Sequence, residues 1–198
     1  MSRTQHDTIT WGMMLRKLPS IAKAIPRVVK GMKVANVKDP TQACGLGWSF
    51  EQATLRNPEG PALLYGEVQL TYAQVNRWAN RIAHHLIAQG IGKGDVVAVF
   101  IENRPELLVT ILAVAKVGAI SALLNTSQTR DALVHSLHLV TPAAIVVGAE
   151  LVPAYLAVRE RVPIEMARTW FVADQDTYSH PGIAPDGFVN LMTASVDA

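Results

Sequence analysis

The sequence predicts an α/β fold, a parallel sheet with helices on both faces, preceded by an amphipathic helical arm. From about residue 72 onward, short apolar runs alternate with segments of helical periodicity. The short runs are apolar throughout, which indicates strands that are covered on both faces. The charge distribution sets the arm apart, because residues 1–40 hold eight Lys and Arg against two Asp, whereas the rest holds ten basic against fourteen acidic residues.

We expect residues 1–47 to form the basic arm and a linker that covers 35–47. An apolar stripe at helical spacing runs through residues 11–34, and most basic side chains fall off it. Pro19 and Pro26 predict two or three short helical pieces rather than one rod.

A basic amphipathic segment with Trp and Met on its apolar side is typical of binding to an anionic membrane surface. The alternative is an arm that packs on the rest of the protein. We do not expect nucleic acid as a partner, because the sequence has no aromatic platform or further basic groove. The candidate membrane contacts are Trp11, Arg16, Lys17, Lys23, Arg27 and Lys30.

Residues 48–198 are predicted to be the α/β unit, which opens with a helix and a hairpin. Ser49 and Gln52 have the spacing of a capping box, so a short helix is expected over 49–56. Two strands, at 62–65 and 68–72, follow around a two-residue turn that has glycine first.

The next helix is expected over residues 72–89. Thr71 and Gln74 predict a capping box at its start, and Gly90 lies where a left-handed C-terminal cap belongs. A β-branched strand follows at 96–101. The remaining elements alternate: a helix at 105–117, a strand at 119–124, a helix at 128–140, a strand at 143–147, a weak helix at 151–161 and a strand at 169–172.

The glycine-rich loop that contains Gly90, Gly92, Lys93 and Gly94 has the composition of a phosphate cradle. Such a cradle needs the order strand, loop, helix, so that the helix N-terminus meets the anion. Here the order is helix, loop, strand, and no Ser or Thr follows the lysine. The loop is therefore predicted to be a helix-to-strand turn.

Residues 107–124 are apolar enough to suggest a membrane span. Lys116 lies inside this stretch and with Gly118 has the pattern of a helix end. We therefore expect a buried helix that leads into a buried strand.

Side chains with catalytic or metal-binding chemistry are few. His135 and His138 lack further ligands at metal-site spacing, and adjacent His84 and His85 are predicted to lie at the surface. Cys44 has no partner for a disulfide, which favours a reducing cytoplasm. No GxSxG elbow occurs, and no glycine follows the strands where a dinucleotide would bind.

Two carboxylates stand at the expected carboxyl end of the strand at 96–101. Glu102 and Glu106 flank Arg104 there, in the region where open α/β sheets often bind ligands. A capping and salt-bridge role is the favoured interpretation.

The stretches 61–91 and 94–150 resemble the N-terminal region of the adenylate-forming acyl-CoA synthetases. The residues ENRPE at 102–106, NT at 125–126 and LVHSL at 133–137 are most similar to the fatty acid transport protein and very-long-chain acyl-CoA synthetase branch. The resemblance is strong over about residues 48–150 and loose afterwards.

The resemblance implies an N-terminal fragment of a long- or very-long-chain fatty acid–CoA ligase. Such an enzyme uses ATP, Mg²⁺ and CoA, and makes an acyl adenylate before the thioester. The family's Ser/Thr/Gly-rich phosphate loop does not occur in these residues, so we assign no catalytic, cofactor-binding or metal-binding residue. The expected partners are the remainder of the synthetase, a long-chain fatty acid and the inner face of a membrane.

Two alternatives stay open at this stage. The chain could be a non-enzymatic module that docks on a membrane or a protein, or part of an adenylating ligase for another carboxylic acid. The acyl-chain length and the oligomeric state are not readable from these residues.

Overall fold

The computed structural model describes residues 11–35, 44–162, 164–165, 168–172 and 184–191. The chain divides into two compact units, Met1–Ala43 and Cys44–Ala198. The assignment of residues 1–47 to a basic arm and linker, and of residues 48–198 to the α/β unit of a synthetase, stays a prediction.

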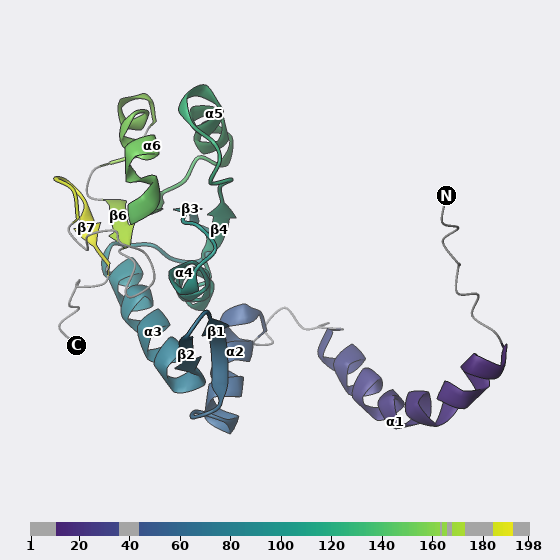
Figure 1. The fold of residues 1–198 in the computed structure, drawn as a ribbon. Helices are drawn as coiled ribbons and strands as arrows, with labels where there is room; N and C mark the ends of the chain where they lie inside the picture. The colour runs from purple at the N-terminus through teal and green to yellow at the C-terminus, as the bar shows by residue number, and fades with distance from the viewer. Residues whose placement is uncertain (1–10, 36–43, 163, 166–167, 173–183, 192–198) are drawn as a thin grey trace, which may run out of the picture. The chain divides into compact units, whose positions relative to one another are not determined.

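The described part of the first unit is one helix, α1 (Trp11–Ala35), which contains Pro19 and Pro26. The prediction of two or three separate pieces is therefore wrong. A proline removes one hydrogen bond and bends a helix without necessarily ending it, and α1 is curved in Figure 1. None of the helices in the described ranges has the length and apolar character needed to cross a membrane.

The second unit begins with α2 (Leu46–Arg56), which starts earlier than predicted. Its N-cap is Gly45, with φ of 103°, and no side chain caps the helix. The Ser49 backbone N–H already donates to the Gly45 carbonyl at 3.0 Å, so Ser49 lies inside the helix. The predicted capping box at Ser49 and Gln52 is wrong, and so is the linker assignment for the residues that begin α2.

The hairpin and the long helix confirm the sequence predictions. Strands β1 (Pro61–Tyr65) and β2 (Val68–Thr71) pair in antiparallel fashion around Gly66, which has φ of 55°. Helix α3 (Tyr72–Ala88) has the predicted capping box: the Gln74 N–H donates to Thr71 Oγ1 at 3.2 Å, and the Thr71 N–H donates to Gln74 Oε1 at 2.8 Å.

The main sheet has five parallel strands in the order β4-β3-β5-β6-β7, which confirms the predicted fold class. Its first four strands match the predicted runs, whereas the short last strand was not predicted. The strands are β3 (Val96–Phe100), β4 (Ile120–Leu123), β5 (Ala144–Gly148), β6 (Thr169–Val172) and β7 (Val189–Asn190).

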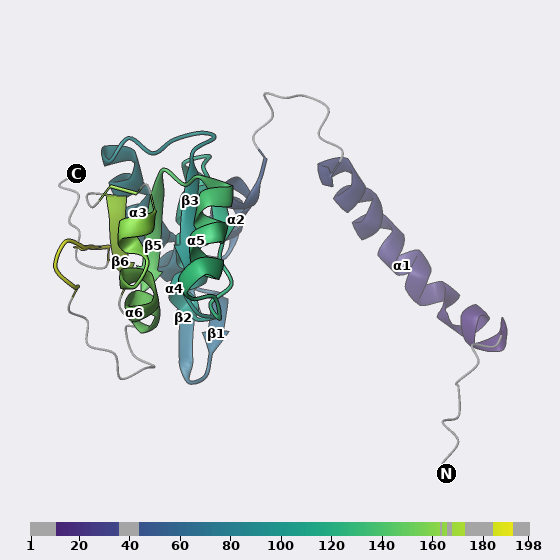
Figure 2. The ribbon, with the colours of Figure 1, turned by 90° about the horizontal axis from the view of Figure 1, so that it is seen from above.

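Helices cover both faces of this sheet. Helices α3 and α4 (Pro105–Lys116) lie on one face, and α5 (Arg130–Val140) and α6 (Val152–Leu156) lie on the other (Figure 1). Figure 2 shows α5 and α6 side by side across the strands. The predicted weak helix at 151–161 is the short α6 between two 3₁₀ turns, Ala149–Leu151 and Arg159–Arg161.

Alternate residues of each strand enter two separate cores. In β3, Val97 and Val99 join the core under α3 and α4, whereas Ala98 and Phe100 join the core under α5 and α6. Strand side chains alternate between faces, so a strand buried on both faces must be apolar at every position. This geometry explains the uniformly apolar runs in the sequence.

Strand β4 departs from the prediction of a buried strand. It lies at the sheet edge, where Ile120 is 54% and Leu123 is 58% exposed. Apolar composition alone does not distinguish an edge strand from a central one. The helix before it follows the prediction more closely, because most of α4 is buried, although Leu108 is 55% exposed.

Candidate functional site

The strand order places a topological switch point between β3 and β5. The chain leaves β3 toward β4 on one side, whereas β5 continues toward β6 on the other. In open α/β sheets the crevice outside the carboxyl ends of such strands is the usual ligand site. The loops that begin at Glu102 and at Ala149 meet there.

A buried ion cluster fills this position. The Arg104 guanidinium donates from Nη2 to Glu150 Oε2 at 3.0 Å and lies 2.8 Å from Glu106 Oε2 through Nη1. The same Nη2 donates to the carbonyl of Val172, the last residue of β6, at 3.0 Å. Arg104 and Glu106 are each 3% exposed. The guanidinium therefore joins the segments that follow β3 and β5 to the end of β6.

The balance of charge in the cluster favours the ionised arginine. Burial opposes the charge, but the hydrogen bond and charge of Glu150, together with Glu106, hold the pKa of Arg104 above its ordinary value. The predicted salt-bridge role is confirmed for Glu106. Glu102 takes part through its backbone N–H, which donates to Glu150 Oε1 at 2.8 Å, while its side chain is exposed.

The glycine loop lies at the opposite, amino end of the strands. The N–H of Gly92 donates to Asp95 Oδ2 at 2.8 Å, and that of Gly94 donates to the Gly118 carbonyl at 3.1 Å. The amides of Gly90 and Ile91 donate to the carbonyls of the last turn of α3, which is a Schellman cap. These four amides are committed to the fold, and the predicted helix-to-strand turn is confirmed.

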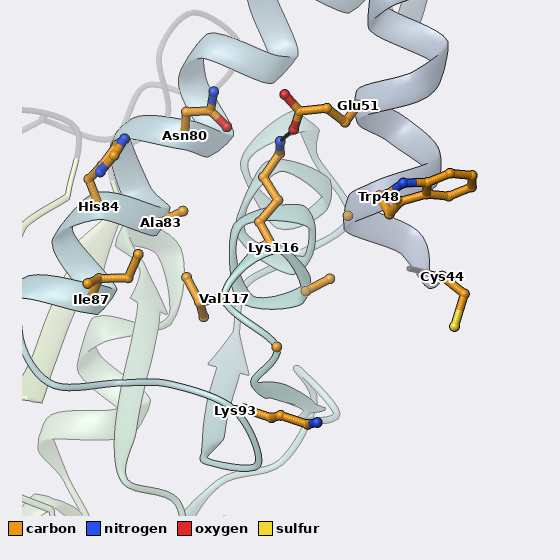
Figure 3. A pocket seen from close by; sticks show the side chains of 13 residues that line it. Cys44, Trp48, Glu51, Asn80, Ala83, His84, Ile87, Lys93, Lys116 and Val117 are labelled. Carbon is orange, nitrogen blue, oxygen red and sulfur yellow. Dashed lines mark hydrogen bonds and ion pairs between the residues drawn. The ribbon is translucent and has the colours of Figure 1, made fainter. Parts of the chain in front are cut away.

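A pocket of about 570 Å³ opens between α2, α3, α4 and this glycine turn. Figure 3 shows Lys116 of α4 reaching Glu51 of α2, with which it forms an ion pair, and His84 of α3 on another wall. Lys93 and Cys44 also line the pocket. Since Lys116 is neutralised and Cys44 and His84 are exposed, the pocket offers no buried nucleophile paired with a base.

Helices α2 and α4 approach closely beside this pocket. A Cβ built on Gly47 would lie 2.9 Å from the Cα of Lys116, which is closer than side chains normally come. Glycine at this position therefore allows the two helices to touch through their backbones.

The two adjacent histidines of α3 have different environments. His84 is exposed, as predicted, but His85 is only 8% exposed and lies edge-on to Trp170, with ring centroids 5.3 Å apart. The surface prediction for His85 is wrong, because it follows Ile82 by three residues and shares the buried face. Burial lowers its pKa from the ordinary value of 6.5.

Of the two histidines of α5, His135 is exposed and His138 takes part in local packing. His138 Nε2 lies 2.9 Å from the Arg161 carbonyl, and Arg161 forms an ion pair of 2.8 Å with Asp131. Within the ranges that the structure describes, no three His, Cys, Asp or Glu side chains gather as a metal ion would require.

The candidate membrane contacts all belong to α1. The side chains of Lys17 and Lys23 are exposed, while those of Trp11, Arg16, Arg27 and Lys30 lie outside what the structure describes. Several apolar side chains of the same helix are 46–65% exposed and fall at three- and four-residue steps: Ile21, Ile25, Val28, Val29 and Met32.

Sequence reasoning missed two partners at these sites. Glu150 is separated from Arg104 by 46 residues, and nothing local to either residue signals the pair. Trp170 comes from a strand far from His85 in the sequence. For the Arg104–Glu150 pair the deciding feature is the strand order, since adjacent parallel strands place their following loops together, and no local sequence signal gives that order.

The family model described as AMP-binding enzyme matches residues 50–186. The chain belongs to this family. Its fold is also that of solved adenylate-forming enzymes: the anthranilate CoA ligase AuaEII, in complex with anthranoyl-AMP, superposes with a TM-score of 0.66 at 16% identity, over 80% of this chain and 28% of that one.

Two curated relatives are similar in sequence. The medium/long-chain-fatty-acid–CoA ligase FadD6 of Mycobacterium tuberculosis is 32% identical over 149 residues, which is 75% of this chain and 25% of FadD6. The long-chain fatty acid transport protein 1 of Rattus norvegicus is 35% identical over 115 residues, which is 57% of this chain and 18% of that protein. The chain therefore spans a quarter or less of the length of these relatives. The predicted resemblance to the acyl-CoA synthetases is confirmed.

Proposed function

We propose that this chain is the N-terminal part of a long- or very-long-chain fatty acid–CoA ligase, and that it provides a structural layer rather than the reacting groups. The single observation that carries the proposal is the similarity to FadD6, which extends over three quarters of this chain but only a quarter of the ligase. The similarity to a fatty acid transport protein supports the same class of substrate.

The overall reaction has two steps. The fatty acid carboxylate attacks the α-phosphorus of ATP and releases pyrophosphate, which gives an acyl adenylate. The CoA thiol then attacks the acyl carbon and displaces AMP, with loss of the thiol proton. Both steps require a site for the ATP phosphates and its Mg²⁺.

The described residues do not fit that phosphate site. The glycine turn uses its amides of Gly92 and Gly94 within the fold, and Arg104 is held between two carboxylates at the switch point. A phosphate cradle needs free amides and an available cation. In our proposal, residues that follow this chain in the full-length ligase provide them.

The test has two parts. Reading the gene past codon 198 should find an open frame that continues into a Ser/Thr/Gly-rich loop, whereas a stop codon there would favour the non-enzymatic module. The full-length product should form oleoyl-CoA from oleate, ATP, Mg²⁺ and CoA. The present chain should form no oleoyl-AMP, and adenylate formation by it would contradict the proposed division of labour.

We further propose that α1 places the cytoplasmic enzyme on an anionic membrane, where its substrates partition. The exposed apolar side chains of α1, together with exposed Lys17 and Lys23, support this role. Each basic residue near such a surface contributes about 1 kcal/mol of binding free energy.

Charge reversal tests the arm. Changing Lys17, Lys23, Arg27 and Lys30 to Glu should abolish co-sedimentation with vesicles of phosphatidylcholine and phosphatidylserine. The matched control reverses four exposed basic residues of the second unit and so makes the same change in net charge: Arg56, Arg77, Arg81 and Lys93. If both variants lose binding equally, net charge rather than the arm is responsible, and unchanged binding of the arm variant would show that α1 packs elsewhere.

A further inference from the structure

An apolar strip crosses the surface beside the carboxyl end of β3. It consists of Leu64 in β1, Leu107 and Leu108 in α4, and Leu123 in β4. Leu64 is 70%, Leu108 is 55% and Leu123 is 58% exposed. We call these four residues the leucine strip.

The strip is continuous because two hollows share its middle. A hollow of about 290 Å³ is lined by Leu64 and Leu108, and one of about 460 Å³ is lined by Leu123. Leu107 and Asn103 line both. Exposed leucines that stand singly are ordinary on a protein surface, but a row of leucines joined by hollows marks an interaction site.

The charges around the strip select an apolar partner. The charged residue that lines the smaller hollow is Arg104, and its guanidinium is paired with Glu106 and Glu150. The charged residue that lines the larger hollow is the exposed Glu102. An anionic partner would gain little from the paired Arg104 or from Glu102, whereas an apolar partner would gain from burying the exposed leucine side chains.

The strip also connects two incomplete sheets. Leu64 belongs to a sheet of two strands, a size that is marginal without further packing. Leu123 belongs to β4, the edge of the five-stranded sheet. Among the described residues, no strand pairs with the outer side of β4. The edge of a parallel sheet is normally covered, and a two-stranded antiparallel sheet needs further packing, so β4 and the hairpin both present surfaces that a larger fold would bury.

We propose that the leucine strip is the docking surface for the polypeptide that follows this chain in the full-length ligase. The inference rests on the proposed function. Its direct support is the length of the relatives, because FadD6 has three quarters of its length outside the matched region. In our proposal part of that remainder packs on this unit.

The first experiment compares hydrogen exchange in this chain and in the full-length ligase. Amides of 61–65, 103–108 and 120–124 should exchange at least about tenfold more slowly in the full-length enzyme. Amides beside the exposed leucines elsewhere, Leu55 and Leu139, should exchange equally in both proteins. Equal exchange at the strip would overturn the proposal without any variant having to fold.

The second experiment compares two triple variants. The strip variant carries Leu64→Lys, Leu108→Lys and Leu123→Lys. The control carries Leu55→Lys, Leu139→Lys and Leu156→Lys, at positions that are 72%, 74% and 41% exposed. In this chain both should unfold within about 2 °C of the wild type, whereas in the full-length ligase the strip variant alone should lose about 5 °C or more.

Other occupants would give different results. A dimer of this chain in sedimentation, converted to a monomer by the strip variant, would assign the strip to a second copy. A rise in the unfolding midpoint with oleate, absent from the strip variant, would assign it to an acyl chain. Either result overturns the inference. If the full-length enzyme is active and its strip and control variants unfold at the same temperature, the docking inference is overturned, but the proposed function is not.

Discussion

The two ends of the parallel strands are held together in different ways. At the amino end, the backbone amides of the glycine turn are bonded within the fold: the Gly94 N–H donates to the Gly118 carbonyl after α4, and the Gly92 N–H donates to Oδ2 of the Asp95 side chain. At the carboxyl end, the side chains of Arg104, Glu106 and Glu150 form a buried ion cluster. The amino end is held mainly by backbone amides, and the carboxyl end is held by charged side chains that the fold brings together.

This difference indicates which end of such a sheet can acquire ligand-binding or catalytic side chains. A turn whose amides are already hydrogen-bonded leaves little for a ligand, whereas side chains at the carboxyl ends can be exchanged without changing the path of the chain. In this chain the carboxyl-end cluster is occupied by its own charges, which is consistent with a layer that supports a site built elsewhere.

The largest expected effect is at the carboxyl end. Arg104→Met removes the cation and leaves the carboxylates of buried Glu106 and partly buried Glu150 without it, so the free energy of unfolding should fall by about 3–5 kcal/mol. Arg161→Met is the control, because Arg161 is 52% exposed in its pair with Asp131 and should cost under about 1 kcal/mol. Urea denaturation measures both, and equal losses would mean that the cluster has no special role.

The next effect concerns the helices beside the amino end. Gly47→Ala adds a Cβ 2.9 Å from the Lys116 backbone, so α2 and α4 must separate, at a cost of about 1–3 kcal/mol. The comparison is Gly92→Ala, where an added Cβ meets nothing within 4 Å. Thermal unfolding of the two variants should differ by several degrees, and a stable Gly47→Ala would show that the helix contact can relax.

A smaller effect is expected within the amino-end turn itself. Gly94 has φ of 89°, which an alanine adopts only with strain, so Gly94→Ala should cost about 1 kcal/mol. Gly92→Ala again serves as the control. Equal urea midpoints for the two variants would show that the positive φ of Gly94 does not require glycine.

The smallest effect depends on pH. Burial lowers the pKa of His85 in the folded chain, so the unfolded chain binds more protons below the ordinary value of 6.5. Stability from this group is present above that pH and declines as the pH falls. His85→Phe keeps the edge-on contact with Trp170 and should flatten this part of the pH profile, whereas His84→Phe should not. A profile unchanged in both variants would contradict this assignment.

The sequence predicted most elements because their signals are local. Thr71 and Gln74 form the expected capping box, and Gly90 closes α3 as a left-handed cap. Where the local signal was ambiguous the prediction failed. Ser49 and Gln52 have capping-box spacing, but the helix began at Leu46. A spacing pattern does not reveal which backbone carbonyl the first helical amide will meet.

Burial was less predictable than secondary structure. Strand β4 has the apolar composition of a central strand and yet lies at the edge, and His85 is buried although it is polar. Strand order and the phase of a helix against its neighbours decide these outcomes, and both depend on contacts between distant segments.

The sequence by itself determined the hairpin, the α3 caps and the turn that resembles a phosphate loop, because each depends on residues within a few positions of one another. It determined the fold class through the alternation of apolar runs with helical periodicity along the chain. Only the tertiary structure decided the pairing of Arg104 with Glu150, the burial of His85 against Trp170 and the continuity of the leucine strip. These features join segments that are far apart along the chain, and their contacts form only when the strands have taken their order in the sheet.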